Sequence, residues 1–268
     1  MADDCLVYFK RSVQEEMTYL AADIPLDWQS AARHIIFSKV NLGEPRTILE
    51  AYCHDWYSAM WLLEATKKPA SERYPHVVDS IRRYAAGRAF LEVGYGAGLF
   101  TMEAANVAFA TYACDLSSAY SAWFAWRAKR HGWLIRVFSV EDELPLRQLK
   151  QPSGLPLLFG FILSHEVLEH HNNPVKAVWD MVRHLHMGGL LYLSTFFNNI
   201  QGQDPSHLEY NQIYQDNYLW ESTLRILGLE PAENNYDGVL KIYRKEREPQ
   251  WNLPNAHGLH SPWRPLRP

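Results

Sequence analysis

The fold of this chain is decided by the stretch Phe90-Leu91-Glu92-Val93-Gly94-Tyr95-Gly96-Ala97-Gly98-Leu99-Phe100. A short apolar run leads into three alternating glycines, and residues with helical spacing follow them. Because glycine adopts backbone conformations that other residues avoid, the chain can turn sharply here and approach a ligand at the start of the helix. The stretch therefore predicts a strand, a tight glycine turn and a helix that together line a binding site.

Short apolar runs and amphipathic stretches alternate downstream of this turn. We expect strands at residues 89–93, 109–114, 134–138, 157–163, 190–196 and 238–243, and helices at residues 99–107, 118–131, 174–185 and 214–227. Alternation of this kind is typical of an α/β fold with a doubly wound, mostly parallel sheet that is covered on both faces. Such sheets bind their ligands beyond the carboxyl ends of the strands.

The chain divides into three regions by composition. Residues 1–85 show helical spacing of apolar side chains and are expected to form an N-terminal helical extension. Residues 86–247 hold the alternating units, and residues 248–268 form a proline-rich tail that we expect to be extended.

Composition excludes several classes of protein. The chain has 268 residues, of which 47% are hydrophobic and 21% charged, so it is an ordinary globular sequence. No apolar run approaches the roughly 20 residues of a membrane span. The acidic start, Met1-Ala2-Asp3-Asp4, is unlike a secretory signal, and a cytoplasmic location is expected. The net charge of −4 and the scattered basic residues make nucleic acid an unfavoured partner, and the oligomeric state is not predicted.

A carboxylate follows the glycine turn at an informative distance. Asp115 lies 21 residues after Gly94, at the end of the next expected strand, where it could accept both hydroxyls of a ribose. The dinucleotide fingerprint would need a small residue at position 99, and this chain has Leu99. The sequence therefore argues against NAD.

The G-x-G-x-G spacing, preceded by Glu92, resembles the S-adenosylmethionine loop of class I (Rossmann-like) methyltransferases. Residues 113–117 are similar to that family's ribose-binding strand end, and residues 161–170 to its fourth-strand segment. Residues 187–195 are similar to the turn and strand that follow. The resemblance covers roughly residues 86–196 in the right order.

The resemblance implies S-adenosylmethionine as cofactor and gives roles to individual residues. Glu92 would help hold the methionine ammonium through the loop, Asp115 would bind the ribose hydroxyls and Leu116 would pack on adenine. Glu141 or Asp142 would contact the adenine amino group, and the sequence does not decide between them. The full cofactor-binding set is Glu92, Gly94, Tyr95, Gly96, Gly98, Asp115, Leu116, Glu141, Asp142 and Ser164.

A second group of polar residues follows the expected fourth strand. Glu166, Glu169 and His170 are spaced so that all three would project from one face of a helical turn, and His207 could join them from a later loop. Carboxylates and imidazoles together suit Mn, Fe, Mg or Zn. The arrangement resembles the metal-binding segment of ubiquinone-pathway O-methyltransferases and of small-RNA terminal 2'-O-methyltransferases. The alternative is the start of a helix at which the glutamates interact favourably with the helix dipole and Leu168 lies in the core.

His165 is the candidate catalytic residue. It directly follows Ser164 at the strand end, close to where the resemblance places the donor methyl group, and a neutral imidazole could accept a proton from a hydroxyl. The leading hypothesis is an S-adenosylmethionine-dependent methyltransferase that acts on a small molecule at oxygen, with or without a divalent metal. The aromatic side chains of Trp56, Tyr57 and Trp61 could cover an apolar or aromatic substrate. The alternatives are an RNA 2'-O-methyltransferase and a catalytically silent cofactor-binding scaffold.

Overall fold

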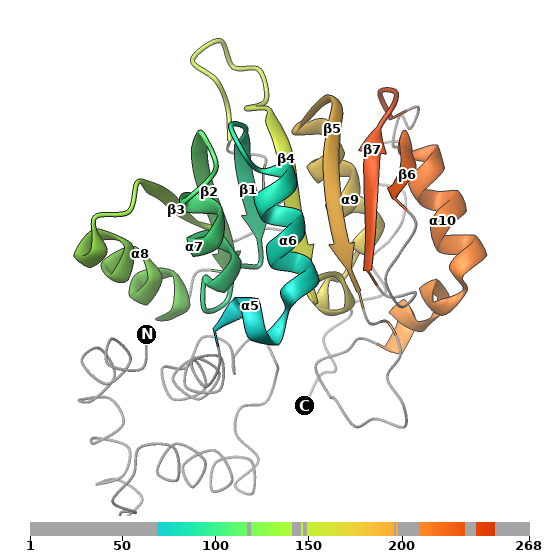
Figure 1. Ribbon diagram of the computed structural model, residues 1–268. Coiled ribbons are helices and arrows are strands. Elements are labelled where there is room, and N and C mark those ends of the chain that lie inside the picture. The colour runs from blue at the N-terminus through green and yellow to red at the C-terminus, as the bar shows by residue number, and fades with distance from the viewer. Residues whose placement is uncertain are drawn as a thin grey trace, which may run out of the picture.

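The structure is a computed structural model, and it describes residues 69–116, 119–140, 146, 149–195, 197, 209–233 and 240–249 (Figure 1). Several predictions lie outside these ranges. They concern most of the N-terminal extension, nearly all of the tail, and the residues Glu141, Asp142 and His207. Within the described ranges, no helix is both long enough and apolar enough to pass through a membrane.

The core of the molecule is a seven-stranded sheet with the order β3-β2-β1-β4-β5-β7-β6. Its strands are β1 (Ala89–Val93), β2 (Ala110–Leu116), β3 (Ile135–Val140), β4 (Phe159–His165), β5 (Leu185–Ser194), β6 (Leu229–Glu233) and β7 (Leu240–Lys245). Strands β1 to β5 pair in parallel, and β7 runs antiparallel to both of its neighbours. The predicted mostly parallel sheet is confirmed.

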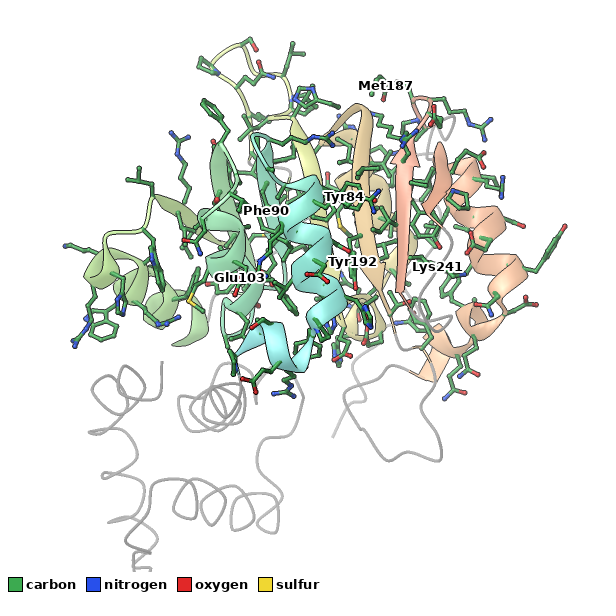
Figure 2. The ribbon with its side chains drawn as sticks, viewed as in Figure 1. Tyr84, Phe90, Glu103, Met187, Tyr192 and Lys241 are labelled. Carbon is green, nitrogen blue, oxygen red and sulfur yellow. The ribbon has the colours of Figure 1, made fainter. Side chains whose placement is uncertain are left out.

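Helices lie on both faces of this sheet (Figure 1). They are α5 (Ala70–Arg73), α6 (Pro75–Tyr84), α7 (Leu99–Ala105), α8 (Ala119–His131), α9 (Pro174–Arg183) and α10 (Asn217–Ile226), with short 3-10 helices η1 (Leu168–His170) and η3 (Glu209–Gln215). Successive strand residues point to opposite faces, so Phe90 packs with α6 and α7 whereas Leu91 packs with α9 and α10. Figure 2 shows Phe90 and Tyr192 beside α6.

Several elements differ from the sequence prediction: β5 begins at Leu185 and not at residue 190, β4 ends at His165 and not at residue 163, and β6 and α10 differ as follows. The strand β6 was not among the expected strands, and it contains Pro231, which cannot donate a hydrogen bond within a sheet. It is tolerated because β6 is the last strand of the sheet. Helix α10 begins at Asn217 and not at residue 214, because Asp216 accepts hydrogen bonds from the backbone N–H groups of Tyr218 (2.8 Å) and Leu219 (3.2 Å) and so caps the helix.

The direction of the strand order reverses between β1 and β4. The chain runs outward from β1 through β2 to β3, and then crosses to β4 on the other side of β1. Ligands of open α/β sheets bind at such a reversal, outside the carboxyl ends of the strands. Figure 1 shows α5 at this end of the sheet, and Figure 2 shows Met187 at the opposite end.

Candidate active site

The glycine loop has the predicted strand, turn and helix. Gly94, Gly96 and Gly98 have φ angles of 73°, 48° and 69°, a backbone region that residues with side chains rarely adopt. The Gly94 N–H donates to the Cys114 carbonyl, and the Gly96 N–H donates to Oδ2 of Asp115, both at 2.8 Å. These bonds join the turn after β1 to the end of β2.

Two of the three glycines also lie against neighbouring side chains. A Cβ atom at Gly94 would come within 2.3 Å of Cγ2 of Val167, and one at Gly98 within 2.0 Å of Cε2 of Phe124. At Gly96 a Cβ atom would meet nothing within 4 Å. The loop is therefore closely packed at its two ends, and its middle faces open space beside Asp115.

Glu92 is enclosed beneath this loop. It is 2% exposed, and the Thr101 hydroxyl of α7 donates a hydrogen bond to its carboxyl group. Burial, with a smaller contribution from the charge of Asp115, raises the pKa of Glu92 to about 8, and the hydrogen bonds from Thr101 oppose this shift. Glu92 thus links β1 to α7, and its contact with a methionine ammonium stays a prediction.

The remaining predicted cofactor residues lie at the carboxyl ends of β2 and β4. Asp115 and Leu116 are the last two residues of β2. The Ser164 hydroxyl is fully buried, and no hydrogen-bond partner for it exists among the described residues. Tyr95 is 3% exposed and its ring lies 4.8 Å from that of Phe124, so it packs under the loop.

The helical turn predicted for the metal cluster does not include Glu166, and metal binding itself stays a prediction because His207 lies outside the described residues. Glu166 follows the last residue of β4 and has a φ of 54°, the one positive value at a non-glycine residue among those described, and it lies outside η1. Its side chain is 56% exposed, whereas Glu169 within η1 is buried. The helical face that would unite Glu166, Glu169 and His170 does not form. In the described part of the chain, no three His, Cys, Asp or Glu residues gather as metal ligands.

His165 lies at the end of β4 among aromatic rings. Its ring centroid is 5.0 Å from that of Tyr74 and 5.2 Å from that of Phe100, and its side chain is 8% exposed. Its Nδ1 lies 4.0 Å from Oε2 of Glu166. Burial lowers the pKa of His165 from its usual value, and the carboxylate of Glu166 opposes that shift. The imidazole is therefore neutral at pH 7.

A buried phenol lies next to His165 on the same face of the sheet. Leu163 of β4 pairs with Tyr192 of β5, and His165 pairs with Ser194, so His165 and Tyr192 are diagonal neighbours. The Tyr192 hydroxyl is buried and has no hydrogen-bond partner among the described residues. Burial and the nearby charge of Glu166 raise the pKa of Tyr192, so this hydroxyl keeps its proton.

Sequence reasoning missed Asn211, which holds the chain that follows β4. The Nδ2 group of Asn211 donates to the carbonyl oxygens of Glu169 at 3.1 Å and His171 at 2.9 Å. The segment that follows β4 also places the Val167 side chain against Gly94. No local pattern in the sequence indicates a contact across about 40 residues, so only the fold reveals it.

Replacing Asn211 with alanine should lower the free energy of unfolding by roughly 2–4 kcal/mol, because two buried carbonyl groups lose their donor. Denaturant unfolding measures this difference. Ile213→Ala, in the same 3-10 helix, is the control because Ile213 is 59% exposed. An Asn211→Ala protein as stable as the Ile213→Ala protein would contradict the role given to this side chain.

Comparisons with known proteins agree with this geometry. Residues 61–239, more than half of the chain, match the family described as Methyltransferase domain. A comparison with curated protein sequences finds no match.

Solved structures include several with a similar fold. N-methyltransferase NodS from Bradyrhizobium japonicum WM9 shares 20% identity, with 68% of this chain and 99% of that chain covered and a TM-score of 0.50. An O-methyltransferase family protein from Burkholderia thailandensis shares 12% identity, with 82% of this chain and 71% of that chain covered and a TM-score of 0.55. The [4+2]-cyclase SpnF shares 20% identity, with a TM-score of 0.47. The match covers 61% of this chain and only 58% of the length of SpnF.

The family match, the strand order and the glycine loop lead to one assignment. The chain belongs to the methyltransferase domain family.

Proposed function

We propose that this enzyme methylates a hydroxyl oxygen of a small molecule and that His165 accepts the proton of that hydroxyl. The observation that carries the proposal is a buried imidazole at the carboxyl end of β4, the strand next to β1 and its glycine loop, and burial lowers the pKa of this imidazole. A base in this position lies at the crevice where an open α/β sheet binds its ligands.

The described residues fit the cofactor. The open space at Gly96, the carboxylate of Asp115 and the hydroxyl of Ser164 lie at the carboxyl ends of the adjacent strands β1, β2 and β4, respectively. The Ser164 hydroxyl has no hydrogen-bond partner within the part of the chain that the structure describes. We expect Asp115 to bind the ribose and Ser164 to donate to the cofactor. When bound, S-adenosylmethionine supplies an electrophilic methyl group on a sulfonium.

The chain's own residues would then align the acceptor and move its proton. As the oxygen–methyl bond forms and the sulfur–methyl bond breaks, the hydroxyl proton passes to the His165 imidazole. Glu166, whose Oε2 lies 4.0 Å from Nδ1, stabilises the resulting positive charge. Tyr74 and Phe100 exclude water from this imidazole, which favours a small acceptor with an apolar or aromatic body.

His165→Asn should lower kcat by roughly 100-fold to 10,000-fold and leave the affinity for S-adenosylhomocysteine unchanged, because only proton transfer is lost. His186→Asn is the matched control, since His186 is exposed at the far end of β5. Transfer of labelled methyl to a panel of phenols and carboxylates, with and without a chelator, measures kcat. A His165→Asn enzyme with wild-type kcat would contradict the role of His165.

The same assay separates the other hypotheses. Methylation of RNA and not of the phenols would favour the small-RNA alternative. Binding of S-adenosylhomocysteine without transfer to any acceptor would favour a silent scaffold.

A further inference from the structure

Large apolar side chains lie exposed at the amino ends of four strands. Phe109 and Leu134 directly precede β2 and β3, Leu155 lies in the connection that leads into β4, and Met187 lies near the start of β5. Their exposed fractions are 85%, 93%, 62% and 56%, in that order. Among the described residues, every other exposed large apolar side chain belongs to η3 or α10. Such a concentration of exposed apolar side chains indicates an interaction surface.

The sheet brings these four side chains to one end of the molecule, which we call the amino-end surface. The first residues of β1 and β2 pair with each other, as do the first residues of β4 and β5, and β3 begins opposite the second residue of β2. Neighbouring strands lie about 4.8 Å apart. The amino-end surface therefore extends across five adjacent strands, at the end of the sheet opposite the glycine loop. Figure 1 shows the connection into β4 projecting beyond β1 and β2 there, and Figure 2 shows Met187 at the same end.

The amino-end surface is basic, although the whole chain has a net charge of −4. Each of the four carboxylates described at this end already lies in an ion pair with an arginine or a lysine. Further exposed basic side chains lie at the ends of α6, α8, α9 and β7 and beside the starts of β1 and β4: Arg83, Lys129, Arg183, Arg247, Arg88 and Lys150. Basic groups thus outnumber carboxylates among the described residues of this surface.

This combination of charge and apolar side chains favours one kind of partner. A second copy of the chain would place like charges opposite each other. A nucleic acid would neutralise the basic groups, but it leaves aliphatic side chains such as Leu134 and Leu155 in water, and only Phe109 of the four could stack on a base. An anionic bilayer attracts the basic groups and also takes up separate apolar side chains at the boundary of its acyl chains.

We propose that the amino-end surface binds the surface of an anionic lipid bilayer. The basic side chains lie at the lipid headgroups, and the four apolar side chains enter the boundary between headgroups and acyl chains. The carboxyl ends of β1 to β5, with His165 and the glycine loop, face away from the lipid. The proposal concerns the opposite end of the sheet from the candidate active site and does not depend on the proposed function.

Cosedimentation of the full chain with vesicles tests the apolar contribution. The protein should bind vesicles of phosphatidylglycerol and phosphatidylcholine and should not bind vesicles of phosphatidylcholine alone. Phe109→Ser combined with Met187→Ser should lower the partition coefficient by roughly tenfold or more, because two large side chains no longer enter the lipid. Tyr218→Ser is the matched control, because Tyr218 is 82% exposed on the first turn of α10, away from this surface.

The same measurement tests the charge. Lys150→Gln should lower the partition coefficient about fivefold, and raising the salt concentration should weaken binding further. Lys176→Gln removes the same charge near the start of α9, at the other end of the sheet, and should leave binding unchanged. Hydrogen exchange on the bound wild-type protein should show protection of amides at residues 106–109 and 186–188 and none in α10.

Several results would overturn the proposal. These are binding to neither kind of vesicle, equal binding to both, or a partition coefficient that the double variant and Lys150→Gln leave unchanged. Retention of the protein by RNA, without binding to anionic vesicles, would assign the amino-end surface to nucleic acid instead. Concentration-dependent dimerisation that the double variant abolishes, again without vesicle binding, would assign it to a second copy of the chain.

Discussion

Replacing Gly98 with alanine is expected to weaken binding of S-adenosylhomocysteine by at least about 100-fold. The new Cβ atom would lie 2.0 Å from the Phe124 ring, and the φ angle of 69° is unfavourable for alanine. Overpacking and backbone strain together disfavour the present loop conformation by about 3 kcal/mol. The free variant would escape this cost by shifting the loop, so binding has to restore the conformation, and this lowers affinity by roughly that factor. Calorimetric titration of the folded variant measures the change.

Gly132 provides a matched control for this substitution. It has the same φ of 69°, but a Cβ atom there would meet nothing within 4 Å. Gly132→Ala should therefore cost about 1–2 kcal/mol of stability and leave cofactor affinity unchanged. Equal affinity in the Gly98→Ala and Gly132→Ala proteins would show that the loop does not hold the cofactor closely.

Glu92→Gln is expected to stabilise the free protein at pH 8.5 by roughly 3–5 kcal/mol. Folding raises the pKa of Glu92 from its usual value of 4.5 to about 8, so the folded state binds the proton more tightly than the unfolded state. The stability gained from this proton is fully present below pH 4.5 and is lost as the pH rises through about 8. Glutamine mimics the protonated acid at every pH and removes this loss.

Denaturant unfolding at pH 6 and at pH 8.5 measures the effect. Glu103→Gln is the control, because Glu103 lies on α7 in a partly exposed ion pair with Arg82 at 3.2 Å. Such ion pairs contribute little to the free energy of unfolding. If the stability of the wild-type and Glu92→Gln proteins changes equally between the two pH values, Glu92 is not the buried acid described above.

The sequence predicted the parts of the site that depend on neighbouring residues. The glycine turn was recognisable because a strand, three glycines and a helix follow one another within residues 90–100. Asp115 was recognisable because the end of the next strand lies at a regular distance from that turn. These features are set by local backbone geometry, and the structure has them in the expected places.

The parts that were missed or wrong depend on tertiary contacts. Glu166 and Glu169 have the spacing of a helical face, but β4 continues to His165 and the chain turns with a positive φ at Glu166. Asn211 and Asp180 hold backbone groups 34 to 42 residues away, which no spacing rule indicates.

Calorimetric titration of the purified protein with S-adenosylmethionine, S-adenosylhomocysteine and NAD tests the central claim most directly. A crevice built by the glycine loop and Asp115 for a sulfonium nucleoside should give saturable heat with the first two compounds and none with NAD. Heat with NAD alone would contradict that account of the site.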